Sequence, residues 1–333
     1  MSTNWALKIE SLGKIHGIPD LRSLEDTGPE KGTAKSALTG SIVAAWDVSF
    51  EVAPGEALGV IGESGSGKST VMRCIAGDQG STTGAVRLRT VHDGHMNVLD
   101  LDPSSRRHLR VADLSVVYQD PAEGLRLNVT AGGNIAEALT AAGWRHFGRI
   151  RDRAAELLDR TEVPLSRMDD LVGTFSGGMR QRFGIAQALL GNPKIIIVDE
   201  PTAGLDPEER NRFNNLLSEI GESIIVVLST HIVEDVRDLC PKMAIISNGK
   251  LILKGKPNEA IDSLKDKIWM KAIEKAELKE HQSNFNIISS NLNSGKINIH
   301  VFSDERPDSG FELISPDLSD VYFSVLAQNQ LKN

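Results

Sequence analysis

The run Gly62–Ser69 has the residue types and spacing that most directly predict chemistry, reading Gly-Glu-Ser-Gly-Ser-Gly-Lys-Ser. It matches the pattern G-x-x-x-x-G-K-[ST], whose backbone N–H groups wrap around nucleotide phosphates. The glycines permit the tight turn, the lysine reaches the β- and γ-phosphates, and the serine ligates Mg²⁺. A chance glycine-rich turn is the alternative, but the flanking strand-like and helical runs supply the context that the motif requires. The expected nucleotide-binding residues are Gly62, Glu63, Ser64, Gly65, Ser66, Gly67, Lys68, Ser69 and Thr70.

An acidic pair, Asp199 and Glu200, follows the apolar run Ile195–Val198. A buried strand would deliver both carboxylates to the carboxyl edge of a parallel sheet, where ligands bind in such folds. There we expect Asp199 to ligate Mg²⁺ and Glu200 to orient and deprotonate the attacking water. The alternative is a helix N-cap with a carboxylate that interacts with the helix dipole. The phosphate motif upstream favours the catalytic interpretation.

A second candidate anion site lies at Ser176, Gly177 and Gly178. These residues precede a helical run over residues 179–190, which Gly191 and Pro193 should end. The N-terminus of a helix presents free N–H groups and the positive end of its dipole. The sequence therefore predicts a second place where a phosphate could bind.

Short apolar runs alternate with helical patterns along most of the chain and should position these motifs. This alternation predicts a mainly parallel sheet covered by helices on both faces. Residues 17–41 are rich in Gly, Ser, Thr, Pro and charge, and we expect a loop-like insertion. Asn248-Gly249 between two apolar runs predicts a hairpin. The expected strands are residues 6–10, 46–52, 57–61, 86–88, 114–118, 195–198, 224–229, 243–247 and 250–253, and expected helices begin near residues 68, 135, 179 and 208.

The ordered set of motifs resembles the nucleotide-binding subunit of ABC-type ATPases. The resemblance covers about residues 6–257 and implies an α/β fold of the P-loop NTPase type, with ATP and Mg²⁺ as ligands and ATP hydrolysis to ADP and phosphate as the activity. It implies an ABC-type ATP-binding domain over residues 1–257, with a helical subdomain at about 120–175. After Pro257 the pattern changes to a helix, strands and a final helix. We therefore expect a small C-terminal accessory α/β domain over residues 258–333.

The resemblance also assigns roles to single positions. Gln119 in VYQDP matches the family glutamine that contacts Mg²⁺ and water, and His231 in STHI matches the histidine that touches the γ-phosphate. Asp206 in AGLDP matches the aspartate of the D-loop. His16 lies where the family often has an aromatic residue that stacks on adenine. Stacking by this histidine and an ordinary surface position are equally compatible with the sequence.

The run Ser176–Gln181 resembles the family signature, usually written LSGGQ. Phe175 replaces the leucine and Met179 the glutamine, whereas the serine and both glycines are intact. In the resembled family this segment closes over ATP held by the opposite subunit. One copy of each motif per chain then implies a homodimer, or a heterodimer with a second ABC-type ATPase, with two composite sites. Closure on ATP and opening after hydrolysis would be the mechanical output, passed to membrane permease subunits.

The two parts of the chain resemble different relatives. Residues 118–183 resemble the ATP-binding protein of the carbon–phosphorus lyase system, which degrades phosphonates, whereas residues 192–333 are similar to exporter-type (ABC-2) ATPases. Arginine prevails over lysine before residue 192 and lysine over arginine after it. We interpret this as a hybrid joined near 191–192. A single gene with a divergent tail is the alternative.

Bulk composition narrows the class of protein. The 333 residues carry a formal net charge of −8 and no long basic run, which argues against a nucleic-acid partner. No apolar run approaches the roughly 20 residues of a membrane helix, so we expect a cytoplasmic chain, peripheral to the inner face of the cell membrane through partner subunits. Cys74 and Cys240 show no metal-ligand spacing and should be ordinary thiols.

Four functions therefore compete. The leading one is the ATPase subunit of a membrane transporter, and the second is an ATPase accessory of a soluble phosphonate-degrading lyase complex. The third is an ABC ATPase acting on DNA or ribosomes, which the missing basic stripe, the missing long coiled coil and the single cassette disfavour. The fourth is a hybrid that binds ATP and couples to no partner.

Overall fold

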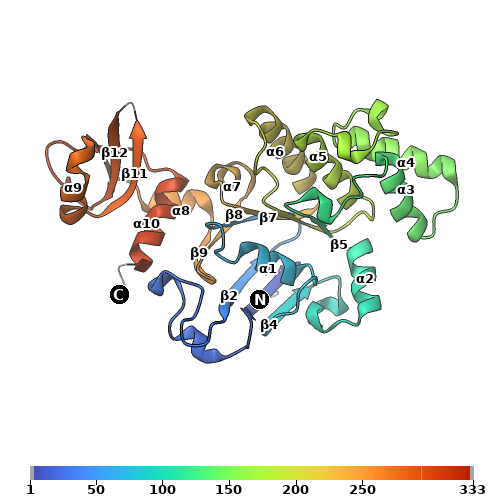
Figure 1. The fold of residues 1–333 in the computed structure, drawn as a ribbon, viewed down its shortest axis with the longest axis horizontal. Helices are drawn as coiled ribbons and strands as arrows, with labels where there is room; N and C mark the ends of the chain where they lie inside the picture. Colours follow the sequence, from blue (N-terminus) through green and yellow to red (C-terminus); the bar gives the residue numbers. More distant parts are fainter. Residues whose placement is uncertain (1–3, 294, 331–333) are drawn as a thin grey trace.

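A computed structural model describes residues 4–293 and 295–330 (Figure 1). Its larger sheet has nine strands in the order β4-β1-β2-β9-β8-β3-β7-β6-β5. The central strands β8, β3, β7, β6 and β5 run parallel to one another, whereas β1 pairs antiparallel with β2 and β4, and β9 pairs antiparallel with β8. The strands are β1 Leu7–His16, β2 Ile42–Val52, β3 Ala57–Ile61, β4 Thr83–Leu88, β5 Leu114–Val117, β6 Ile195–Asp199, β7 Ile225–Thr230, β8 Lys242–Ser247 and β9 Lys250–Gly255.

The prediction of a mainly parallel sheet is confirmed, and one side of the sheet adds an antiparallel wing that was not expected. The central strands are continuous buried runs, the pattern of strands covered on both faces. β1 and β2 instead include exposed positions and carry an antiparallel wing. The hairpin at Asn248-Gly249 is confirmed, and both turn residues adopt positive φ angles of 43° and 80°, as a tight two-residue turn requires.

Helices cover both faces of the large sheet. Successive residues of β6 alternate between two buried clusters: Ile196 and Val198 belong to one, Ile195 and Ile197 to the other. Each face of the strand therefore packs against its own core. The helices are α1 Lys68–Ile75, α2 Pro103–Ala112, α3 Ala131–Ala141, α4 Phe147–Arg160, α5 Gly177–Ala188, α6 Pro207–Gly221, α7 Val233–Leu239 and α8 Pro257–Ser263.

Two of these helices, α2 and α7, have no counterpart among the helices expected from the sequence. Their apolar residues are few, so the helical period is weak, and α7 spans only seven residues. A local signal does precede α2: Asp102 accepts N–H bonds from Ser104 and Ser105, and Pro103 occupies the first turn. The region between residues 120 and 175 contains α3 and α4, which lie at the end of the molecule opposite the C-terminal sheet (Figure 1).

The C-terminal part forms a separate sheet of four strands in the order β11-β12-β10-β13. A small core of its own includes Ile299, Val301 and Phe311. Its last helix nevertheless contributes Leu318 and Tyr322 to a buried cluster of the nucleotide-binding part. The elements are β10 Ile268–Ile273, α9 Leu278–Asn284, β11 Ile287–Asn293, β12 Lys296–Phe302, β13 Glu312–Leu313 and α10 Leu318–Gln330. The expected domain boundary near 257–258 stays a prediction.

The insertion 17–41 is folded against the large sheet. It contains two short 3₁₀ turns, η1 (Leu21–Leu24) and η2 (Pro29–Lys31). The carboxylate of Asp26 accepts the N–H groups of Ala37 and Leu38 at 2.7 and 3.0 Å. Glu30 forms an ion pair with Lys250 of β9 at 2.5 Å, which ties η2 to the sheet.

A partly buried ion pair should make the stability of the C-terminal part depend on pH. His300 Nδ1 of β12 lies 2.6 Å from the Asp320 carboxylate of α10. That hydrogen bond, against the opposing effect of burial, raises the pKa of His300 above its ordinary value. The pair therefore contributes fully below the unfolded pKa of about 6.5, and its contribution is lost as pH rises through the raised folded pKa.

We expect His300→Gln to lower the free energy of unfolding by about 1–2 kcal/mol at pH 6, the worth of a hydrogen bond to a charged group. The difference from the parent should shrink as the pH is raised well past the folded pKa, because the parent loses the same charge. Urea unfolding of both proteins at a series of pH values measures this. A difference that is constant with pH would contradict the assignment.

Candidate nucleotide-binding site

The loop between β3 and α1 has the backbone that a phosphate-binding turn needs. Gly65 and Gly67 adopt φ angles of 80° and 109°, in the left-handed region that favours glycine. A Cβ atom on Gly67 would also collide with the carbonyl oxygen of Ala44 in β2, and one on Gly62 with that of Ile246 in β8. Neighbouring strands thus enforce these glycines, and the loop leads directly into the first turn of α1.

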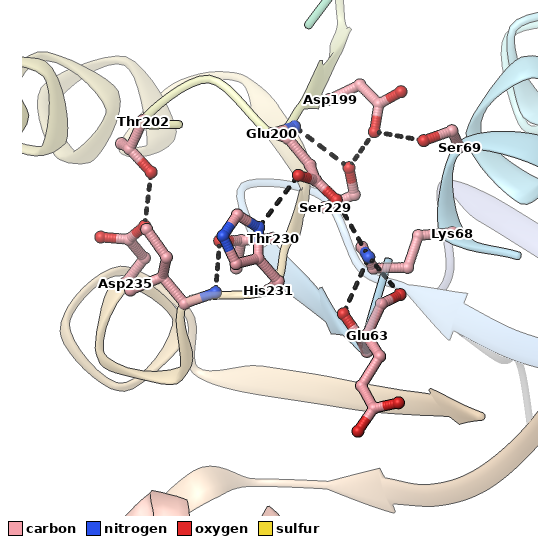
Figure 2. Close-up of polar contacts among 12 residues, drawn as sticks. Glu63, Lys68, Ser69, Asp199, Glu200, Thr202, Ser229, Thr230, His231 and Asp235 are labelled. Atoms are coloured by element: carbon pink, nitrogen blue, oxygen red, sulfur yellow. Dashed lines mark hydrogen bonds and ion pairs between the residues drawn. The ribbon is translucent and has the colours of Figure 1, made fainter. Parts of the chain in front are cut away.

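Lys68 is folded back into this loop. Its side chain is only 3% exposed, and Nζ donates to the carbonyl oxygens of Gly62 and Glu63 at 2.8 and 3.0 Å. Nζ also lies 3.0 Å from a carboxylate oxygen of Glu200, the residue after β6 (Figure 2). The lysine is therefore held at the loop, and the Glu200 carboxylate balances its charge.

Asp199 and Ser69 form an oxygen-donor site between β6 and α1. The Ser69 hydroxyl donates to Asp199 Oδ1 at 3.2 Å, and the Ser229 hydroxyl of β7 donates to the same oxygen (Figure 2). A carboxylate and a hydroxyl are ligands that suit Mg²⁺, which commonly takes one or two protein oxygens and completes its shell with phosphate and water. Among the described residues there is no group of three acidic, His or Cys side chains placed to hold a metal ion.

Glu200 occupies a strained and buried position. It adopts a φ angle of 44°, which is uncommon for a residue with a side chain, and such strain often marks functional sites. Burial acts to raise the pKa of Glu200, but Lys68 and His231 outweigh it and hold that pKa below its ordinary value. The carboxylate is therefore ionised at neutral pH and accepts protons or hydrogen bonds. The alternative that Asp199 and Glu200 cap a helix is wrong, because α6 begins at Pro207.

His231 completes this cluster from the end of β7. Its Nδ1 lies 2.9 Å from the second carboxylate oxygen of Glu200, and its side chain is 44% exposed (Figure 2). The structure thus joins Lys68, Ser69, Asp199, Glu200 and His231, predicted from separate parts of the sequence, in one network of contacts. Their roles in binding and catalysis remain predictions.

Two members of the site, Ser229 and Asp235, were not expected from the sequence. Ser229 of β7 lies opposite Asp199 of β6 in the sheet. Its sequence signal was a polar residue within a buried strand. Asp235, 1% exposed, accepts the Thr202 hydroxyl at 2.7 Å and Arg210 Nε at 2.8 Å. Asp235 thereby ties the segment after Glu200 to α7, a contact between distant segments with no local sequence signal.

Several predicted residues lie outside this network of described contacts. Gln119 is exposed, and its carbonyl accepts a bond from Gln181 at 3.4 Å. His16 is exposed at the end of β1. Asp206 caps α6 by accepting the Glu209 N–H at 2.9 Å. Their predicted contacts with nucleotide, water or a partner require a bound or dimeric state.

The two signature glycines have different surroundings. Ser176 caps α5 by accepting the Met179 N–H at 3.2 Å, so the helix begins two residues earlier than expected, at Gly177. A Cβ on Gly178 would collide with the carboxylate of Glu209, which pairs with the buried Arg182. A Cβ on Gly177 would meet only a Leu205 methyl at 3.9 Å. In the single chain a Cβ on Gly178 would displace the Glu209 side chain from its pairing with Arg182, whereas Gly177 is open.

We expect Gly177→Ala to keep or slightly raise thermal stability, since alanine favours a helix by up to about 1 kcal/mol. Its ATPase rate should nevertheless fall about tenfold or more, because the methyl group stands where a phosphate would approach the helix N-terminus. Gly178→Ala is the matched comparison and should lower the melting temperature. Full activity in Gly177→Ala would contradict the phosphate contact.

The fold and the phosphate loop identify the chain as an α/β P-loop NTPase. Its helical region and its signature segment are those of an ABC cassette. The family model for the ABC transporter matches residues 46–203. The chain is 39% identical over 218 residues to the "Putative phosphonates utilization ATP-binding protein PhnK" of Escherichia coli (strain K12), covering 65% of this chain and 84% of that one. This chain therefore belongs to the family of ABC transporter ATP-binding proteins.

Further relatives belong to the same family, but their names give different transport functions. The "Methionine import ATP-binding protein MetN 2" of Shouchella clausii is 38% identical over 211 residues, covering 63% of this chain and 59% of that protein. The chain thus spans less than two thirds of this relative. The ATP-binding cassette MJ0796, solved as a dimer bound to ADP and Pi, superposes with a TM-score of 0.62 at 26% identity, covering 75% of this chain and 98% of that one.

Proposed function

We propose that this chain is the ATP-hydrolysing subunit of an ABC transporter and that it couples ATP-driven dimer closure to transport by separate membrane subunits. The observation that carries the proposal is the cluster in which Lys68, Glu200 and His231 meet at the phosphate loop. A second support is the open helix start at Ser176 and Gly177, which lies outside that cluster and so could serve the nucleotide of another chain.

The reaction we propose is ATP and water to ADP and phosphate. The loop amides and Lys68 would hold the phosphates, and ionised Glu200 would accept a proton from the attacking water. His231, hydrogen-bonded to Glu200, would orient that carboxylate. Ser69, Asp199 and Gln119 would hold Mg²⁺, which supplies neutralisation of the phosphate charge.

The contact between Lys68 and Glu200 also explains how binding could prepare hydrolysis. Nζ of Lys68 lies 3.0 Å from a carboxylate oxygen of Glu200, so the two charges balance each other. Bound phosphates would attract the same ammonium group, since charge-assisted contacts to phosphate are strong. Glu200 would then have an oxygen free for water, so the base becomes available only when ATP occupies the loop.

The alternative is an accessory ATPase of a soluble phosphonate-degrading lyase complex. The specific observation in its favour is the similarity to PhnK, which extends over 84% of that relative. Under the leading proposal, the chain would bind a permease at the inner face of the cell membrane. It would do so as a homodimer or as a heterodimer with a second ABC-type ATPase. No helix among the described residues is long and apolar enough to cross a membrane.

Co-purification of the full chain from its host distinguishes the transporter function from the lyase-accessory function. Detergent-extracted membranes and the soluble fraction are purified in parallel through a tag on the chain, and ATPase activity is measured with and without each recovered partner. Partners with membrane spans that raise the ATPase rate support transport. Soluble lyase subunits support the alternative, and an ATPase rate that no recovered partner changes contradicts coupling altogether.

A further inference from the structure

The carboxylate of Asp235 joins the two segments that carry Glu200 and His231. Asp235 follows His231 in the first turn of α7, and its side chain is 1% exposed. Its Oδ2 accepts the hydroxyl of Thr202, which lies in the segment after Glu200, at 2.7 Å (Figure 2). Because Glu200 also contacts His231 at 2.9 Å, the two segments are connected at two points.

The other oxygen of the Asp235 carboxylate is held by α6. Oδ1 accepts Nε of Arg210 at 2.8 Å and Nδ2 of Asn214 at 2.9 Å. Thr202 is buried as well, at 3% exposed. A buried charge is costly unless its oxygens are hydrogen-bonded, so the hydroxyl of Thr202 is held firmly at Oδ2. The contact between Thr202 and Asp235 is therefore a fixed anchor for the segment after Glu200.

The backbone of Glu200 needs such an anchor. Its φ angle of 44° is one that a residue with a side chain rarely adopts, and such strain persists only where the surrounding structure fixes the backbone. On one side, the Glu200 N–H donates to the carbonyl oxygen of Ser229 in β7 at 2.9 Å. On the other side, only Pro201 separates Glu200 from Thr202 and its bond to Asp235. The strained turn is thus held at both ends.

We propose that Asp235 is a positioning residue for ATP hydrolysis, which holds the turn at Glu200 through the hydroxyl of Thr202 and so aims the Glu200 carboxylate. The inference rests on the proposed function and adds a residue that acts through the base. A general base must lie within hydrogen-bond reach of the proton it accepts. The contacts of Asp235 run to Thr202 and α6 rather than to the phosphate loop, so its effect should fall on the chemical step and leave ATP binding unchanged.

The test is Thr202→Val, which keeps nearly the same shape and removes the hydroxyl. We expect kcat to fall by about 10- to 10²-fold, because a displacement of about 1 Å at a reacting group can have that effect. The dissociation constant for ATP should not change. Amide hydrogen exchange over residues 200–206 should become faster, because the segment loses its anchor. Thr202→Ser, which keeps the hydroxyl, should recover most of the lost rate.

Asn214→Ala is the matched control. It also removes one hydrogen bond to the Asp235 carboxylate, but from α6, and Arg210 still holds the same oxygen. Both variants should lower the melting temperature, because each leaves a buried carboxylate with one partner fewer. Only Thr202→Val should change kcat and the exchange over residues 200–206. All measurements are made well below the lower of the melting temperatures, so that partial unfolding cannot imitate a slower reaction.

The outcomes separate this inference from the proposed function. A parent protein that hydrolyses ATP while Thr202→Val keeps the same kcat overturns the inference alone. Equal losses of kcat in Thr202→Val and Asn214→Ala would also overturn it, because they would report a general loosening of the structure. A parent that does not hydrolyse ATP contradicts the proposed function. Hydrogen exchange then tests the anchor by itself, and unchanged exchange over residues 200–206 in Thr202→Val would overturn the inference.

Discussion

Replacing Glu200 with glutamine is expected to lower the ATP turnover rate by about 10²–10⁴-fold, the usual weight of a positioned general base. Glutamine fills nearly the same volume and can still accept the hydrogen bond from Lys68, so ATP binding should be retained. Because hydrolysis would no longer open the closed state, ATP should trap a dimer. Steady-state phosphate release and gel filtration with Mg²⁺ and ATP measure the two effects.

A matched substitution on the neighbouring helix provides the control. Glu208 lies in the first turn of α6 with a side chain that is 77% exposed, and it contacts Arg212. Glu208→Gln changes the same chemical group without touching the candidate site, so its turnover should equal that of the parent. Normal turnover in Glu200→Gln would show that another group accepts the proton.

Lys68→Ala should weaken ATP binding by about 10²-fold or more, because charged hydrogen bonds to the phosphates are lost. The structure adds a second effect. The substitution leaves the buried Glu200 carboxylate without its counter-charge at 3.0 Å, and breaking such a pair costs about 3–5 kcal/mol of stability. Nucleotide titration and urea unfolding would record a loss in both properties.

A double variant separates the two effects of Lys68. In Lys68→Ala with Glu200→Gln the buried charge is absent, so most of the lost stability should return. ATP binding should stay weak, since the phosphates still lack their ammonium partner. Recovery of tight ATP binding in the double variant would show that Lys68 serves mainly to balance Glu200.

Neither cysteine is expected to take part in the reaction. Burial raises the pKa of Cys74 to about 11 and that of Cys240 to about 12, so both thiols stay protonated. Both are buried and free, which confirms the interpretation of the sequence.

Most of the chemistry at this site could be predicted from the sequence, because each motif is a contiguous run of residues. The phosphate loop needs glycines at fixed offsets from Lys68, and the acidic pair needs only a buried strand before Asp199; both requirements are local. The class of fold followed from the alternation of apolar strands and helices. Family membership, the loop and the acidic pair were therefore determined by the order of residues alone.

The tertiary structure decided what depends on the order of strands in the sheet. That order places β7 beside β6, so Ser229 meets Asp199, and it places β1 and β2 in an antiparallel wing. It also brings Tyr322 of α10 into the same buried cluster as Ile61 of β3, although the two residues are far apart in the chain. A local pattern carries no information about which distant segments become neighbours, because that choice belongs to the packing of the whole chain.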